Sequence, residues 1–256
     1  MPASTPEVTG KVRISLVIAE VGEALPEELA SVVRTWVRAI QHGFFGAVEI
    51  RVHGDIETEG WVVSGSVECH RVPRAAFRAL SKLVSRFAQR KMCVVRSIIT
   101  GDAGQRLGDD SGATVPVLPP ALPFTVEYPK YLRREVRVEI EFCHAFSQAT
   151  WDVLLEAFHI WDVLVDAIGD PERSPDGSEY AVHRLSPSMI EHEIFGYIAD
   201  FECLDFIVWL ALRWHQHQRV DAGRVHLLAV DLNPVAPHVL GLVHGQVGVA
   251  HQGDGV

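Results

Sequence analysis

Apolar and polar side chains alternate along residues 11–20, so that Val12, Ile14 and Leu16 share one face, the pattern of a half-buried strand. Residues 26–42 change to apolar positions spaced about three or four residues apart, which predicts an amphipathic helix. Continued to residue 100, these patterns predict the order β-α-β-β-α-β. The expected strands are 11–20, 47–52, 61–69 and 93–100, and the expected helices are 26–42 and 73–91.

A second series of the same kind begins after residue 130. The strand expected at 135–143 places Val136, Val138 and Ile140 on one face, and a long apolar helix is expected at 148–168. For residues 186–194 we expect a loop or a turn of helix. The remaining expected elements are strands at 180–185, 195–203 and 224–231 and a helix at 204–218.

Short sequence matches between the two series suggest that one structural unit is duplicated. The matched segments are Val12-Arg13-Ile14 with Val136-Arg137-Val138, Glu68-Cys69 with Glu202-Cys203, and Met92-Cys93-Val94-Val95 with Val225-His226-Leu227-Leu228. The β-α-β-β-α-β order resembles the split-βαβ, ferredoxin-like superfold. That resemblance implies antiparallel sheets with helices over one face, and it fixes no function.

We therefore expect an α+β chain that is a tandem duplication of a ferredoxin-like unit with antiparallel sheets. Its expected parts are an N-terminal tail at 1–10, a first copy at 11–100, a Gly/Pro-rich linker at 101–130, a second copy at 131–232 and a loose C-terminal tail at 233–256.

Charge distinguishes the two halves. Residues 11–100 hold 13 Lys and Arg against 9 Asp and Glu, whereas residues 131–232 hold 8 against 18. The whole chain of 256 residues has a formal net charge of −10, which argues against general binding to nucleic acid. An acidic second half instead favours a basic partner.

The helix expected at 73–91 has a row of cations at every fourth position. The row consists of Arg74, Arg78, Lys82, Arg86 and Arg90. Three interpretations are open: a solvated face whose long side chains cover apolar surface, a docking face for an acidic surface of this or another chain, and a phosphate or nucleic-acid site. The aromatic residues fall on the opposite stripe, so the helix offers no platform for stacking bases.

Carboxylates gather on the expected open face of the second sheet. Glu139 and Glu141 have outward parity on the strand at 135–143, and Asp200 and Glu202 have it on the strand at 195–203. His226 on the last strand can join them. We consider a hydrated sheet face, a surface for a basic partner, and a site for a divalent metal or for acid–base chemistry.

Recognisable catalytic motifs are missing from the sequence. The four cysteines show no Cys-x-x-Cys spacing, and the 13 histidines match no metal-binding spacing, so we expect no metal and no cofactor. Asp162 belongs to a polar stripe with His159 that is typical of the solvated side of a helix. Without an apolar signal segment at the N-terminus or a spanning stretch, we expect a cytoplasmic protein with no membrane partner.

We therefore expect a non-catalytic acidic cytoplasmic protein that binds another protein or itself, as an inhibitor, an adaptor or a scaffold subunit. The alternative is an enzyme or a small-ligand-binding protein with a carboxylate and histidine site between the two copies. Its candidate residues are Glu141, Glu202, His144 and His226.

Overall fold

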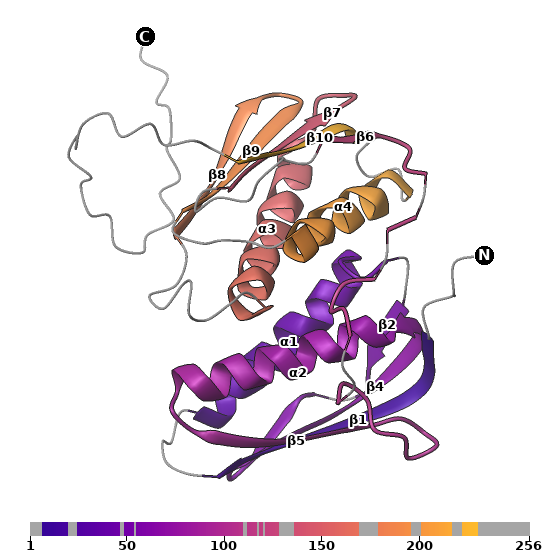
Figure 1. Ribbon diagram of the computed structural model, residues 1–256, viewed down its shortest axis with the longest axis vertical. Helices are drawn as coiled ribbons and strands as arrows, with labels where there is room; N and C mark the ends of the chain where they lie inside the picture. Colours follow the sequence, from indigo (N-terminus) through magenta and orange to yellow (C-terminus); the bar gives the residue numbers. More distant parts are fainter. Residues whose placement is uncertain are drawn as a thin grey trace, which may run out of the picture.

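In the described part of the computed structural model, two largely antiparallel sheets lie on the outside of the molecule and four helices lie between them (Figure 1). The layers run sheet, helices, helices, sheet, so the chain has a mixed α+β fold. The structure describes residues 7–19, 25–46, 49–53, 55–109, 112–116, 118–119, 121–127, 136–168, 179–195, 201–216 and 222–229. The expected C-terminal tail at 233–256 lies outside these residues.

The first sheet and its two helices use residues 7–100. The elements are β1 (Glu7–Ala19), α1 (Leu25–His42), β2 (Glu49–Val52), β3 (Glu57–Glu59), β4 (Val62–Pro73), α2 (Arg74–Arg90) and β5 (Val94–Thr100). The strand order is β2-β4-β1-β5, with β3 paired to β4, and every pairing is antiparallel. β1 begins at Glu7 and therefore occupies part of the expected N-terminal tail.

Alternating burial along β1 fixes which face of the first sheet meets the helices. Val12, Ile14 and Leu16 are buried, whereas Lys11 and Arg13 are exposed on the other face. The apolar stripes of α1 and α2 cover the buried face, because burial of apolar surface is the main force that attaches an amphipathic helix to a sheet.

The second half contributes β6 (Thr125–Glu127), β7 (Val136–Phe142), α3 (Gln148–Ile168), β8 (Glu179–Ser186), β9 (Met189–Phe195), α4 (Phe201–Gln216) and β10 (Ala222–Ala229). Its strand order is β6-β10-β7-β9-β8. All pairings are antiparallel except that of β6, which runs parallel to β10 and lies within the expected linker. Without β6, the order of successive strands is the same as in the first sheet.

The structure corrects the expected course of residues 186–204. Residues 189–195 form strand β9, not a loop or helical turn, and α4 begins at Phe201, so Glu202 lies on a helix and not on a strand. Asp200 lies outside the described residues. The physical reason for the missed strand is an inward-facing polar residue, His192, which interrupts the apolar alternation of β9.

The register also corrects two of the sequence matches. Ile14 pairs with Gly65, and the matching position Val138 pairs with His192 of β9, so the match of Glu68-Cys69 with Glu202-Cys203 is wrong. Likewise Leu16 pairs with Ser97 while Ile140 pairs with Val225. The counterpart of Val225 is therefore Ser97 and not Met92.

The two halves meet through their helices. α3 packs against α1 and α2, and Phe206 of α4 makes edge-on ring contacts with Phe44 and Phe45 just after α1. Trp209 Nε1 donates a hydrogen bond of 2.9 Å to the carbonyl of Pro116 in the connecting segment. Both sheets therefore turn their uncovered faces away from the other half (Figure 1).

Candidate functional site

The uncovered face of the second sheet is rich in carboxylates. Val138 and Ile140 of β7 are fully buried toward the helices, so Arg137, Glu139 and Glu141 occupy the opposite face, in agreement with the expected parity. Glu139 is half-buried and Glu141 is exposed. On the adjacent β9, Glu191 and Glu193 flank the inward His192 and so share that face.

Strand register aligns ionisable residues in a row across this face. Glu139 pairs with Glu191 of β9 on one side and with His226 of β10 on the other. The row continues to His183 of β8 and to Glu127 of β6. The sequence therefore placed Glu139, Glu141 and His226 correctly on adjacent strands, but it missed Glu191 and Glu193.

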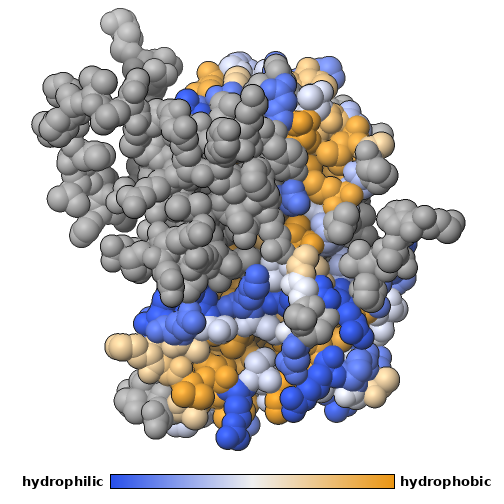
Figure 2. Space-filling view, viewed as in Figure 1, coloured by the Kyte–Doolittle hydropathy of each residue, from blue (hydrophilic) through white to orange (hydrophobic). Residues whose placement is uncertain are grey.

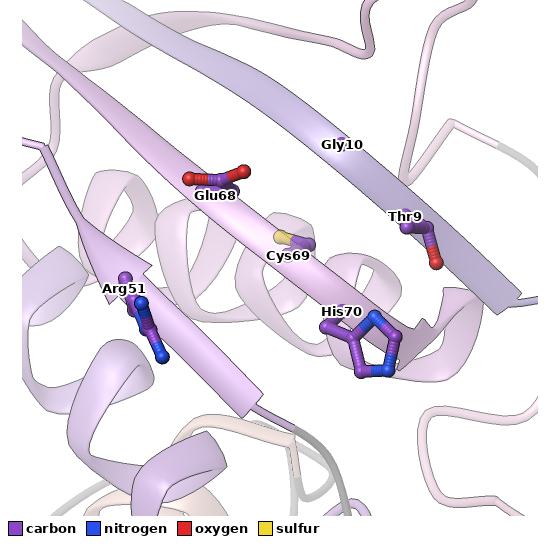
Figure 3. A pocket seen from close by; sticks show the side chains of 6 residues that line it. All are labelled: Thr9, Gly10, Arg51, Glu68, Cys69 and His70. Atoms are coloured by element: carbon purple, nitrogen blue, oxygen red, sulfur yellow. The ribbon is translucent and has the colours of Figure 1, made fainter.

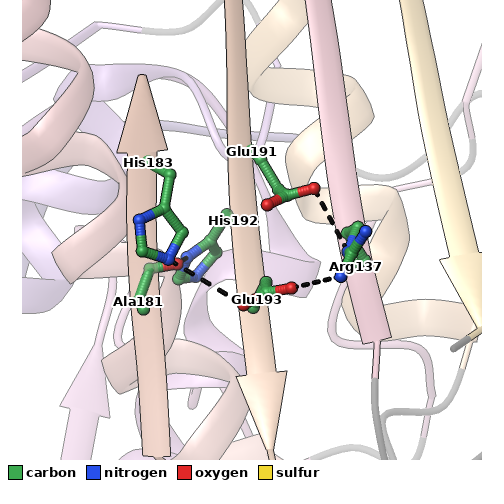
Figure 4. A network of polar contacts seen from close by, with 6 residues as sticks. All are labelled: Arg137, Ala181, His183, Glu191, His192 and Glu193. Carbon is green, nitrogen blue, oxygen red and sulfur yellow. Dashed lines mark hydrogen bonds and ion pairs between the residues drawn. The ribbon is translucent and has the colours of Figure 1, made fainter. Parts of the chain in front are cut away.

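A single guanidinium ties two of these carboxylates together (Figure 4). Arg137 Nε lies 3.2 Å from Glu191 Oε2, and Arg137 Nη2 lies 2.5 Å from Glu193 Oε1. His183 Nε2 approaches the other oxygen of Glu193 at 3.8 Å. We call the surface formed by Arg137, Glu139, Glu141, Glu191 and Glu193 the acidic sheet face.

Charge on the acidic sheet face is only partly balanced. Arg137 supplies one positive charge beside four carboxylates, of which Glu191 is buried. The register places Arg224 of β10 opposite Glu141, and no ion pair of Glu139 or Glu141 is seen within the described part of the chain. Carboxylates on neighbouring strands repel one another and attract cations. Among the described residues no group of three or more His, Cys, Asp or Glu is arranged to hold a metal ion.

Beneath this face lies a buried polar pair that the sequence did not reveal. His192 Nε2 lies 2.6 Å from Asp162 Oδ1 of α3, and His192 Nδ1 lies 3.0 Å from the carbonyl of Ala181. Phe158 and Trp161 contact the imidazole, with ring centroids 4.9 and 5.0 Å away. Asp162 is buried, so its assignment to a solvated stripe is wrong, whereas His159 is exposed.

The cation row of α2 does not form one uniform surface. Lys82 and Arg90 are exposed, Arg74 and Arg78 are half-buried, and Arg86 is buried. Arg78 Nη1 donates a 2.9 Å hydrogen bond to the carbonyl of Ala113. The hydrogen bond of Arg78 and the burial of Arg86 show that part of the row serves contacts inside this chain.

A small hollow on the uncovered face of the first sheet lies at a β-bulge (Figure 3). Thr9, Gly10, Arg51, Glu68, Cys69 and His70 line a volume of about 190 Å³. The bulge separates Val8 from Gly10, and Arg71 adopts a φ of 57° while its N–H donates to Thr9 Oγ1 at 3.0 Å. Only Gly10 marked this irregularity in the sequence.

The hollow contains a thiol that is poorly suited to nucleophilic chemistry. Burial, followed by the negative charge of Glu68, raises the pKa of the Cys69 thiol to about 12. A nucleophilic cysteine requires a lowered pKa, since the thiolate is the reactive form. Cys69 therefore fits the expected role of a small apolar core residue.

Two residues of the alternative enzyme site, Glu141 and His226, do not lie between the two halves. Glu141 and His226 belong to strands of the second sheet, and the helices separate that sheet from the first half. His144 is exposed just after β7, and Glu202 lies on α4.

Comparison with solved structures yields distant likenesses, one of which is described below. No family model and no curated protein matches the chain. Among solved structures, the crystal structure of a putative glycine cleavage system transcriptional repressor is 11% identical and covers 87% of this chain and 99% of its own. Its TM-score is 0.23, a value too low to carry an argument about fold or function. Among the described helices, none has the length and apolar character that crossing a membrane requires.

Proposed function

We propose that this protein is a non-catalytic binding protein of the cytoplasm whose acidic sheet face docks a basic surface of another protein. The observation that supports this proposal best is the set of four carboxylates on adjacent strands β7 and β9. Arg137 forms ion pairs with two of them but supplies only one positive charge. Such a surface is compatible with an inhibitor, an adaptor or a scaffold role.

The physical support is charge complementarity. A patch of one sign steers the approach of an oppositely charged partner and disfavours partners of like charge. Arg137 holds Glu191 and Glu193 in place, while Glu139 and Glu141 lie beside them with no ion pair within the described part of the chain. A Lys or Arg from a partner would relieve the repulsion among these groups.

We also propose that the architecture is a tandem duplication of a ferredoxin-like unit. The support is the shared order of successive strands, β2-β4-β1-β5 in one sheet and β8-β9-β7-β10 in the other. In the first half the helices follow β1 and β4, and in the second half they follow β7 and β9. In each half the two helices cover one face of the sheet. Duplication followed by divergence of charge accounts for one basic and one acidic half.

The test replaces Glu139 and Glu141 with Lys. Immobilised wild-type protein should retain basic proteins from a native lysate at low salt and release them as salt rises, because screening weakens exposed charge pairs. The E139K/E141K variant should lose these proteins, and with a purified partner its affinity should fall at least about tenfold, or 1.4 kcal/mol.

The matched control carries the same change of charge elsewhere. Glu57 and Glu59 are both exposed on β3 of the first sheet, so E57K/E59K alters the net charge equally without touching the acidic sheet face. This control should bind as the wild type does. Equal loss of binding in both variants, or retention in both, would contradict the proposal, provided that circular dichroism shows native folding.

A further inference from the structure

Strand β5 forms an apolar edge of the first sheet. Among the described residues its only strand partner is β1, apart from a bridge between Thr100 and Arg106 at its end. The opposite edge strand β2 has four residues and includes Glu49 and Arg51, a length and charge that discourage further pairing. β5 has seven residues, with Arg96 as its single charge.

Large apolar side chains are exposed along β5. Met92 is 93% exposed just before the strand, Val94 is 59% exposed and Ile98 is 42% exposed. A long exposed edge with apolar side chains is a template for pairing with another chain, so it marks an interface or an aggregation site.

A groove of about 540 Å³ runs between this edge and α2. Val84, Ser85 and Ala88 line it from the helix, and Cys93, Val95 and Ser97 line it from the strand side. None of the lining residues is charged. In Figure 2 apolar surface lies below the blue band of α2, over the region that β5 occupies in Figure 1.

Hydrogen bonds at both ends of β5 show which of its backbone groups point away from β1, toward the open edge. The carbonyl of Ile99 accepts the N–H of Leu107 at 2.9 Å, on the side away from β1. At the other end Val95 is paired with Ile18, whose N–H donates to the Trp61 carbonyl on the β4 side. Because strand polarity alternates, the N–H and C=O groups of Val95 and Ser97 point outward.

We propose that a second copy of this chain pairs its β5 antiparallel with this β5, with the two-fold axis at Val95. Three registers are compatible with antiparallel pairing near the middle of the strand. An axis at Arg96 places two arginines directly opposite each other, which is unfavourable. An axis at Ser97 brings the second copy against Ile99, where the segment 105–107 already pairs.

The axis at Val95 avoids both conflicts. Val95 faces Val95 of the second copy, Val94 faces Arg96, and Cys93 faces Ser97. The groove side of α2 is compatible with this arrangement, because Ser81, Ser85 and Ala88 are small and neutral. An isologous pairing of this kind closes after two copies.

Engineered disulfides test the register. The V94C/R96C variant should form covalent dimers on mild oxidation, because facing residues of a non-hydrogen-bonded pair have Cα atoms about 4.5 Å apart, within disulfide range. Two matched controls test the other registers. V94C/I98C would crosslink if the axis were at Arg96, and R96C/I98C would crosslink if it were at Ser97. Both controls should remain uncrosslinked. The parent carries Cys93→Ser and Cys143→Ser, because Cys93 is partly exposed and Cys143 is exposed.

Light scattering and a proline variant test the interface itself. The wild type should have the mass of a dimer, and V95P should be monomeric with unchanged circular dichroism, because Pro is tolerated where the N–H faces outward from an edge. If V95P fails to fold, the disulfide pattern alone tests whether β5 pairs with a second copy about Val95. The proposal is overturned by a monomeric wild type, by a dimer that persists in folded V95P, or by crosslinking of a control pair. A monomer that takes up an extended segment of another protein at this edge would overturn it as well.

Discussion

At the scale of single residues, His192 shows how one polar side chain can be accommodated in an apolar layer. Both ring nitrogens meet an oxygen, from Asp162 at 2.6 Å and from Ala181 at 3.0 Å. Burying a polar group without such partners would cost a few kcal/mol. The pair therefore makes β9 and α3 depend on each other.

Replacing Asp162 with Ala should lower the free energy of unfolding by about 3–5 kcal/mol, because it leaves His192 buried without its carboxylate. Urea unfolding followed by circular dichroism measures the change. The matched control is Asp152→Ala on the same helix, where the exposed carboxylate accepts a hydrogen bond from Gln148 Nε2. This control should cost no more than about 0.5 kcal/mol. Equal losses in the two variants would show that the buried pair contributes no more to the free energy of unfolding than an exposed hydrogen bond does.

At the scale of elements, α2 lies where the sequence predicts it, but its cations differ in exposure, which the sequence does not predict. Strong periodicity predicted a helix at 73–91, and the structure has it at Arg74–Arg90. Its cations looked alike in the sequence, yet Arg86 is buried and Lys82 is exposed. The difference lies in burial within the folded chain, which the local sequence pattern does not encode.

We predict that Arg86→Glu destabilises the protein by more than about 2 kcal/mol, since a buried charge is replaced by one of opposite sign. Lys82→Glu changes the net charge equally at an exposed position and should shift stability by at most about 0.5 kcal/mol. Thermal and urea unfolding of both variants give the comparison. A stable Arg86→Glu variant would restore the interpretation of the row as a solvated face.

The same scale shows why part of the acidic sheet face was predictable from sequence. Glu139 and Glu141 follow from alternation with Val138 and Ile140, a signal contained in one strand. Glu191 and Glu193 do not, because His192 occupies the inward position between them. Its partner Asp162 lies 30 residues away in the chain, so the strand is recognisable only once α3 is in place.

At the scale of the whole molecule, the layered architecture separates the two proposed surfaces. The acidic sheet face lies on the second sheet and the β5 edge lies on the first, at opposite ends of the stack (Figure 1). A dimer formed through β5 would therefore leave both acidic sheet faces uncovered. Two linked binding faces raise the effective affinity for a repeated or dimeric partner without any new contact.

The helix layers hold the two halves together, and Phe206 is the residue that tests this connection. It is fully buried, and its ring lies 6.3 Å from that of Phe44 and 5.3 Å from that of Phe45, both in the first half. Phe206→Ala should cost about 3–5 kcal/mol, as expected for removing a buried aromatic ring. It should also reduce the coupling between the halves, because the lost contacts span them.

Unfolding monitored by several probes distinguishes lost coupling from simple destabilisation. In the wild type, tryptophan fluorescence and circular dichroism should report a single coincident transition, the mark of cooperative unfolding. In Phe206→Ala the two curves should separate. The matched control is Phe77→Ala, which removes a similar ring whose aromatic partner, Trp36, lies in the first half. Its curves should shift together and stay coincident, because the ring contacts of Phe206 with Phe44 and Phe45 are intact. Coincident curves in Phe206→Ala would mean that other contacts between the helix layers carry the coupling.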